Sequence, residues 1–202
     1  MNTPPLLIFA KAPIPGQVKT RLIPELGAHG ACALYTRLLR HTLTQTADWP
    51  GPRLLYCAPD TRHPALQALA TSFQLELRDQ HGDDLGMRMH NALADHPGGA
   101  LLIGTDCPDL DCSHLHQAAD ALATHHSVFL PSEDGGYVLV GQQQAHPAPF
   151  TAMHWSQPDV MAQSLLRLKA AGLSYWLGPT LWDLDEPADL PRLQLPDNGT
   201  GS

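Results

Sequence analysis

The chain has 202 residues, of which 43% are hydrophobic and 16% charged, as in a globular protein with a substantial core. Its formal net charge of -8 argues against sequence-independent binding to nucleic acid or to an anionic membrane, since both need surplus lysine and arginine. No apolar run approaches the ~20 residues of a membrane helix, and four cysteines without a signal peptide lead us to expect a cytoplasmic protein with reduced thiols.

Short apolar runs alternate along the chain with longer amphipathic stretches, as strands alternate with crossover helices. The predicted strands span residues 5–10, 53–58, 73–78, 100–105, 127–131 and 136–141. The predicted helices span residues 28–47, 83–94, 113–125 and 159–171, with Ser113 and Asp159 as N-caps of the last two. This order predicts a three-layer α/β/α sandwich with a mainly parallel mixed sheet, in one domain over residues 1–195 followed by a flexible tail at 196–202.

The loop after the first predicted strand combines rigidity with positive charge. FAKAPIPGQVKTRL, residues 9–22, contains two prolines, Gly16 and the cations Lys11, Lys19 and Arg21. Ligands bind beyond the carboxyl ends of the strands in such sheets, and lysine and arginine hold phosphate there by charge and by paired hydrogen bonds. The loop therefore predicts a phosphate site; a solvated basic turn is the alternative.

The third predicted strand is followed by HGDDLGMRM, residues 81–89. Its position makes Asp84 and Arg88 candidates for binding the nucleotide. The two residues are also spaced for an ion pair between successive turns of a helix, so a purely stabilising role is the alternative.

The motif LLIGTDCPDL, residues 101–110, runs a buried strand directly into Asp106. An ionised carboxylate in that position is costly to desolvate unless a cation or strong donors meet it. Oxygen ligands of this kind suit Mg2+ or Mn2+ shared with substrate phosphates. We therefore predict a metal ligand at Asp106, with helix capping as the alternative.

In PSEDGGYVLVG, residues 131–141, Gly135 and Gly136 allow the backbone to approach a ligand closely. Asp134 is a candidate to orient or deprotonate an acceptor hydroxyl, and Tyr137 a candidate to contact the substrate. The same Asp-Gly-Gly sequence is what a tight hairpin between two strands requires, so a structural reading stands beside the functional one.

The late motif WDLDEPADL, residues 182–190, supplies Asp183 and Asp185. On an extended segment these two side chains point to the same side, and facing Asp106 they would complete one divalent site or a closely spaced pair. Solvated loop charges are the alternative. His154, which precedes the last predicted helix, is a further candidate metal ligand.

Taken in order, these five motifs resemble a family of uncharacterised transferases (DUF2064) with the GT-A, or nucleotide-diphospho-sugar transferase, fold. The resemblance covers about residues 5–192, and the family includes a branch described as arsenosugar-biosynthesis glycosyltransferases. The Lys-Thr-Arg-Leu run and the late Asp-x-Asp are also similar, more distantly, to phospholactate and phosphoenolpyruvate guanylyltransferases.

The resemblance implies that Lys19 and Arg21 contact the phosphates of the donor. It also implies that Asp106 holds a divalent ion, with Asp183 and Asp185 at the same centre. Both roles agree with the chemistry expected of these residue types.

The sequence therefore predicts a metal-dependent transferase in which Lys19, Asp106 and Asp134 act in catalysis. The leading prediction is glycosyl transfer from a nucleotide-sugar to a small acceptor, with the metal and cations stabilising the leaving diphosphate. Nucleotidyl transfer from a nucleoside triphosphate, releasing pyrophosphate, is the alternative. A non-catalytic nucleotide-binding module is a third, although a pure anion sensor would gain nothing from three convergent carboxylates.

Overall fold

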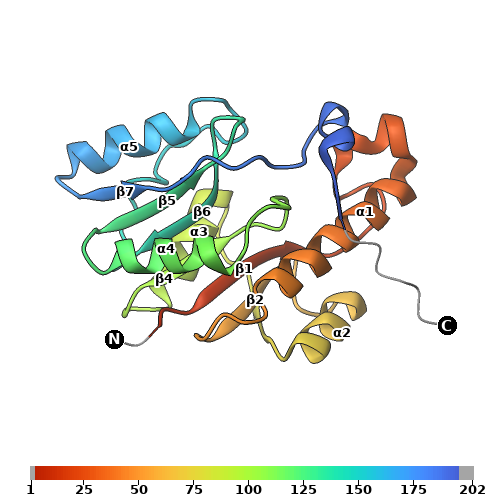
Figure 1. Ribbon diagram of the computed structural model, residues 1–202, viewed down its shortest axis with the longest axis horizontal. Coiled ribbons are helices and arrows are strands. Elements are labelled where there is room, and N and C mark those ends of the chain that lie inside the picture. Colours follow the sequence, from red (N-terminus) through yellow and green to blue (C-terminus); the bar gives the residue numbers. More distant parts are fainter. Residues whose placement is uncertain (1–2, 196–202) are drawn as a thin grey trace.

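A seven-stranded sheet forms the centre of the computed structural model, which describes residues 3–195 (Figure 1). Its strands are β1 (Leu6–Lys11), β2 (Arg53–Ala58), β3 (Glu76–Asp79), β4 (Ala100–Ile103), β5 (Ser127–Pro131), β6 (Tyr137–Gln142) and β7 (Tyr175–Leu177). They lie in the order β3-β2-β1-β4-β6-β5-β7. Because β6 is antiparallel to β4 and β5 while the other pairs are parallel, the sheet is mainly parallel and mixed.

Helices cover both faces of this sheet (Figure 1). They are α1 (Ile23–Gln45), α2 (Pro64–Phe73), α3 (Leu85–Ala94), α4 (Cys112–Leu122) and α5 (Val160–Ala170), with two 3-10 helices, η1 (Thr20–Leu22) and η2 (Pro187–Arg192). Residues of α1, α2 and α4 pack in the core on one face, and residues of α3 and α5 pack on the other. The predicted three-layer α/β/α sandwich is confirmed.

The central strands are apolar at nearly every position because both of their faces are covered. In β1, Leu6 and Ile8 pack in the core shared with α1, whereas Leu7 packs in the core shared with α3. All three side chains are fully buried. Each such burial contributes about 1.5–3 kcal/mol, so the strands that carry the loops of the site are firmly fixed.

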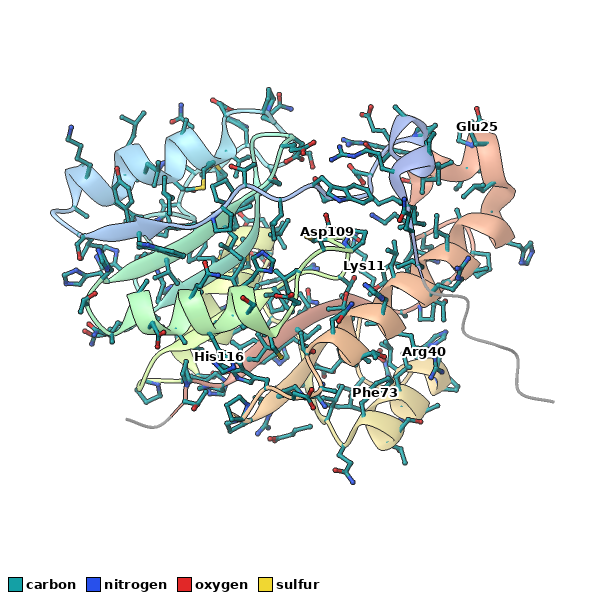
Figure 2. All side chains as sticks on the ribbon, viewed as in Figure 1. Lys11, Glu25, Arg40, Phe73, Asp109 and His116 are labelled. Atoms are coloured by element: carbon teal, nitrogen blue, oxygen red, sulfur yellow. The ribbon has the colours of Figure 1, made fainter. Side chains whose placement is uncertain are left out.

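A third, smaller apolar cluster holds the late part of the chain against the start of α1. Leu184 and Trp182 are buried there beside Leu34 and Leu38. The indole Nε1 of Trp182 also donates a hydrogen bond of 2.7 Å to Oδ2 of Asp109, which lies in the loop after β4 (labelled in Figure 2). The late Asp-Leu-Asp segment is thereby fixed next to the carboxyl end of β4.

Several predicted boundaries differ from the structure. Phe73, placed in a strand by its apolar pattern, ends α2, and β3 begins only at Glu76. The N-cap of α4 is Asp111 and not Ser113, because Asp111 Oδ1 accepts the 3.1 Å hydrogen bond from His114 N that closes a capping box. Asp159 occupies the N-cap of α5 but makes no side-chain capping bond. The predicted tail, 196–202, lies outside the described residues.

Within residues 3–195 no helix combines the length and apolar character needed to cross a membrane.

The turn between β5 and β6 packs closely against the start of α5. Gly135 has φ 91°, and a Cβ atom built there would lie 1.9 Å from the carbonyl oxygen of Pro158. We expect Gly135→Ala to lower the free energy of unfolding by about 2–4 kcal/mol, from backbone strain and steric overlap together. Gly172→Ala is the matched control, because Gly172 also has positive φ but meets nothing within 4 Å. Urea denaturation should show a clearly smaller loss for the control; equal losses would contradict the packing argument.

Candidate active site

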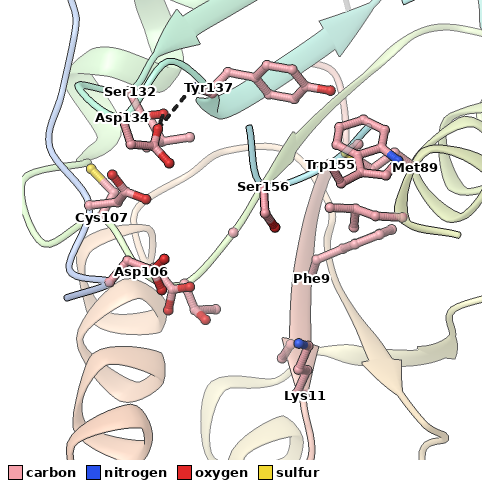
Figure 3. A pocket seen from close by; sticks show the side chains of 18 of the residues that line it. Phe9, Lys11, Met89, Asp106, Cys107, Ser132, Asp134, Tyr137, Trp155 and Ser156 are labelled. Carbon is pink, nitrogen blue, oxygen red and sulfur yellow. Dashed lines mark hydrogen bonds between the residues drawn. The ribbon is translucent and has the colours of Figure 1, made fainter. Parts of the chain in front are cut away.

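A cavity of about 660 Å3 lies at the carboxyl ends of the central strands, bordered by the loops after β1, β4 and β5 and by the late segment. This volume is within the range of small-molecule sites, roughly 300–1,000 Å3. Figure 3 shows Asp106 and Asp134 on one side of the opening and Phe9, Met89 and Trp155 on the other. The cavity therefore has a charged half and an apolar half.

Lys19 lies in the middle of the charged half. Its ammonium is 2.9 Å from Asp106 Oδ1 and 3.9 Å from Asp185 Oδ1, and it donates a hydrogen bond to the carbonyl oxygen of Leu184. Only 3% of its side chain is exposed. The backbone of Lys19 is left-handed, with φ 47° and ψ 44°, a conformation that is uncommon outside glycine and persists where surrounding contacts fix it. The loop is thus shaped to deliver this one cation to the ends of β4 and the late segment.

Four carboxylates line the cavity around this lysine: Asp106, Asp134, Asp183 and Asp185. The pKa of Asp183 is raised to about 6, first by burial and then by the negative charges of its three neighbours, while Lys19 acts in the opposite direction. The single positive charge of Lys19 therefore does not neutralise the negative charge of the four carboxylates. Additional positive charge would stabilise it.

The carboxylate oxygens of this site are suitable ligands for a hard divalent cation. Asp106 Oδ1 is shielded from solvent and has no hydrogen-bond partner among the described residues, although Lys19 Nζ lies 2.9 Å away. Within the described part of the chain, no three His, Cys, Asp or Glu side chains are already close enough to hold a metal ion together. Mg2+ is usually bound by one or two carboxylates together with substrate phosphates, so a preformed cage is not required. Metal binding by Asp106, Asp183 and Asp185 stays a prediction.

Arg21 stands at the rim of the site with half of its side chain exposed. It pairs with Asp185 and lies 3.9 Å from Glu186 Oε1. Lys11 also lines the cavity, and among residues 3–195 it forms no ion pair. The first loop therefore brings three cations to the cavity, and two of them already face carboxylates.

The structure confirms the hairpin reading of the Asp-Gly-Gly sequence, and the functional reading stays a prediction. Oδ1 of Asp134 accepts hydrogen bonds from Ser132 Oγ and, at 2.9 Å, from Gly136 N, which closes the turn between antiparallel strands. The Asp134 side chain nevertheless lines the cavity, as do Gly136 and Tyr137. One carboxylate oxygen thus serves the turn, while Oδ2 has no hydrogen-bond partner among the described residues.

The ion pair that was the alternative reading of Asp84 and Arg88 does not form. Asp84 caps α3 by accepting a 2.8 Å hydrogen bond from Met87 N, and Arg88 Nε donates a 3.0 Å bond to Gly82 O. Asp84 caps the helix in preference to pairing with Arg88, because capping satisfies an otherwise unpaired N–H at the start of the helix. Arg88 lines the cavity and Asp84 does not.

Three other predicted residues also lie outside the cavity lining: Gly16, Gly135 and His154. Gly16 has φ 84° in the first loop, where it supplies backbone freedom. Gly135 packs on the start of α5 as described above, and His154 is exposed to solvent. The structure therefore gives the two glycines a role in loop shape.

The apolar half of the cavity had no counterpart in the sequence prediction. Phe9, Met89 and Trp155 lie together, and the hydroxyl of Tyr137 points toward Trp155 (Figure 3). The Tyr137 hydroxyl and Trp155 Nε1 are buried without a hydrogen-bond partner among the described residues. These residues come from β1, α3, β6 and a loop, and no periodic pattern joins them. Only the tertiary fold brings them into one wall.

Tyr35 of α1 is a further residue that the sequence did not reveal. Its hydroxyl accepts a 2.7 Å hydrogen bond from Lys11 N and donates a 3.0 Å bond to Lys11 O. Burial, followed by the charge of Asp106, raises the pKa of Tyr35, so the hydroxyl keeps its proton. It therefore clamps the chain where β1 passes into the first loop.

Asp183→Asn should stabilise the metal-free protein above pH 6. The folded state raises the pKa of Asp183 from 3.8 to about 6, so ionisation has no cost below pH 4 and its full cost above pH 6. Removing the charge should gain about 1–3 kcal/mol at pH 7.5 and nothing at pH 4. Urea denaturation in EDTA measures this, with the exposed Asp120→Asn as control. Unchanged stability of the Asp183 variant at pH 7.5 would show that the carboxylates are not electrostatically crowded.

The mixed seven-stranded sheet and its charged cavity define a protein with the fold of nucleotide-dependent transferases. Residues 42–157, more than half of the chain, match the family described as "Uncharacterized protein conserved in bacteria (DUF2064)". The chain belongs to this family. No curated protein sequence matches it.

Solved structures give a consistent comparison. A proposed nucleotide-diphospho-sugar transferase from Desulfovibrio desulfuricans G20 is 28% identical, covers 100% of this chain and 90% of its own, and has a TM-score of 0.86. A CMP:2-keto-3-deoxy-manno-octonic acid synthetase complexed with CTP is 12% identical, with coverages of 94% and 96% and a TM-score of 0.59. A 4-diphosphocytidyl-2C-methyl-D-erythritol synthase from Anaerococcus prevotii DSM 20548 is 10% identical, with both coverages 94% and a TM-score of 0.60. The last two share the fold alone.

Proposed function

We propose that the protein is a metal-dependent transferase that moves a sugar from a nucleotide-diphospho-sugar to a small acceptor. The proposal is carried by one observation: a buried lysine and four carboxylates meet in a cavity at the carboxyl ends of the strands, with Lys19 Nζ 2.9 Å from Asp106 Oδ1. Similarity over the full chain to the D. desulfuricans protein supports the class of donor.

In this proposal the aspartates of the cavity and Lys19 have separate roles. Asp106, with Asp183 and Asp185, would hold Mg2+ or Mn2+, which supplies Lewis-acid stabilisation of the leaving diphosphate. The Lys19 ammonium binds oxygens of the same diphosphate and stabilises the charge that grows on them as the bond between the sugar's anomeric carbon and the diphosphate breaks and the acceptor oxygen bonds to that carbon. The Oδ2 atom of Asp134 orients the acceptor hydroxyl or takes its proton.

Nucleotidyl transfer is a second candidate, favoured by the number of cations at the cavity. Lys11, Lys19, Arg21 and Arg88 all line it, which suits the larger charge of a triphosphate. In that reaction an oxygen of the acceptor attacks the α-phosphorus and pyrophosphate leaves. The fold shared with the synthetase solved in complex with CTP is compatible with this chemistry.

Product analysis separates the two candidates. The purified protein is incubated with Mg2+ or Mn2+, a panel of nucleotide-sugars, a panel of nucleoside triphosphates and mixed acceptors, while released nucleoside diphosphate and pyrophosphate are measured separately. Metal-dependent release of nucleoside diphosphate supports glycosyl transfer, and pyrophosphate alone would replace it with nucleotidyl transfer. If neither product is released and no nucleotide changes the melting temperature, both candidate functions are contradicted.

A further inference from the structure

The Lys19 ammonium already lies among the four carboxylates, where a metal ion would bind. It lies between Asp106 and Asp185, and the lysine side chain is almost completely withdrawn from solvent. The Oδ1 atom of Asp106 is shielded from solvent, although the side chain as a whole is half-exposed. A shielded anionic oxygen needs a positive partner, and in the absence of other ions Lys19 is the partner of Asp106. Any cation that binds Asp106 Oδ1 must therefore accept an ammonium 2.9 Å from its ligand oxygen.

The lysine and a divalent cation consequently compete when no anion is present. Like charges repel strongly in a partly buried site, because solvent screens them poorly. A phosphate group changes the balance, since it offers oxygens to both positive groups and places negative charge between them.

The local hydrogen bonding allows Lys19 to change partners. An ammonium has three donors and no acceptor, and one of the three is used by the carbonyl oxygen of Leu184. That bond keeps the ammonium in the site, while the remaining donors can serve either Asp106 or a phosphate. Leu184 is itself fully buried, so this anchor is fixed.

We infer that Lys19 makes binding of the divalent cation conditional on the nucleotide's phosphates, so that metal and nucleotide bind cooperatively. This inference rests on the proposed function. The charge of Arg21 acts more weakly on the metal ligands, because half of its side chain is exposed at the rim, where solvent screens it. Lys169, which is exposed at the end of α5 and does not line the cavity, provides the control for the loss of one positive charge.

The test measures Mn2+ binding by electron paramagnetic resonance of the free ion, with and without ADP, GDP, CDP or UDP at matched free Mn2+. For the wild-type protein we expect at least one diphosphate to tighten Mn2+ binding by about tenfold or more. Lys19→Met should bind Mn2+ alone about tenfold more tightly than the wild type and gain less than about threefold from any diphosphate. Lys169→Met should behave like the wild type within about threefold, because the residue is exposed and lies outside the cavity.

The outcomes separate this inference from the function on which it rests. If Mn2+ alone binds the wild type and Lys19→Met equally well, the coupling is overturned, although the metal site stands. If neither protein binds Mn2+ with any diphosphate, the proposed metal dependence fails as well. Circular dichroism and cooperative melting verify folding, and Lys19→Gln replaces Lys19→Met if the latter does not fold. Should both fail to fold, equal wild-type Mn2+ affinity with and without the diphosphates overturns the inference.

Discussion

Replacement of Asp106 by asparagine should reduce metal-dependent turnover by about 10^3-fold or more while leaving the fold intact. The amide retains the shape of the side chain but loses the anionic oxygen that would bind the divalent cation, an interaction worth several kcal/mol in the transition state. Asp106 is 45% exposed, so the change should cost little stability. The measurement is kcat/KM with the donor identified by product analysis, together with the melting temperature.

Asp109→Asn is the matched control for this experiment. Asp109 lies in the same loop, binds Trp182 and does not line the cavity. An asparagine oxygen can still accept the indole hydrogen bond, so we expect activity within about threefold of the wild type. Full activity of the Asp106 variant would remove that residue from the site, and equal losses in both variants would point to loop damage instead of lost chemistry.

Lys19→Met should reduce kcat/KM by about 10^2–10^3-fold, the usual effect of removing one group that stabilises developing negative charge. The variant keeps the long apolar stem that fills the buried position but has no ammonium to hold the leaving diphosphate. The loss should appear mainly in kcat, since the interaction strengthens as the diphosphate departs. Lys169→Met, an exposed change at the end of α5, controls for the loss of one positive charge. Retained activity in Lys19→Met would make this lysine a purely structural tether between the first loop and the late segment.

The spatial convergence of distant motifs was predictable because parallel strands bring the loops at their carboxyl ends to one edge of the sheet. Lys19 follows β1 and Asp106 follows β4, and these strands are neighbours. The strands at 53–58 and 127–131 were also predicted with their observed bounds, since turn residues flank short, almost wholly apolar runs.

Other features depend on contacts that no local pattern records. Strand β7, Tyr175–Leu177, has only three residues and owes its pairing to the neighbouring β5. The wall of Phe9, Met89 and Trp155 and the clamp of Tyr35 on Lys11 arise between elements far apart in the sequence. At Asp84 two local patterns competed. Its spacing to Arg88 suited an ion pair, but its carboxylate instead accepts a hydrogen bond from an otherwise unpaired N–H at the start of the helix.

A crystal of the protein soaked with Mn2+ and a nucleoside diphosphate tests the central claim most directly. Anomalous scattering locates manganese without ambiguity, and ordinary density shows the phosphates. We predict manganese bonded to Asp106 and to the diphosphate, with the Lys19 ammonium on the same diphosphate. A diphosphate bound away from Lys19, with no manganese at Asp106, would contradict the proposed site.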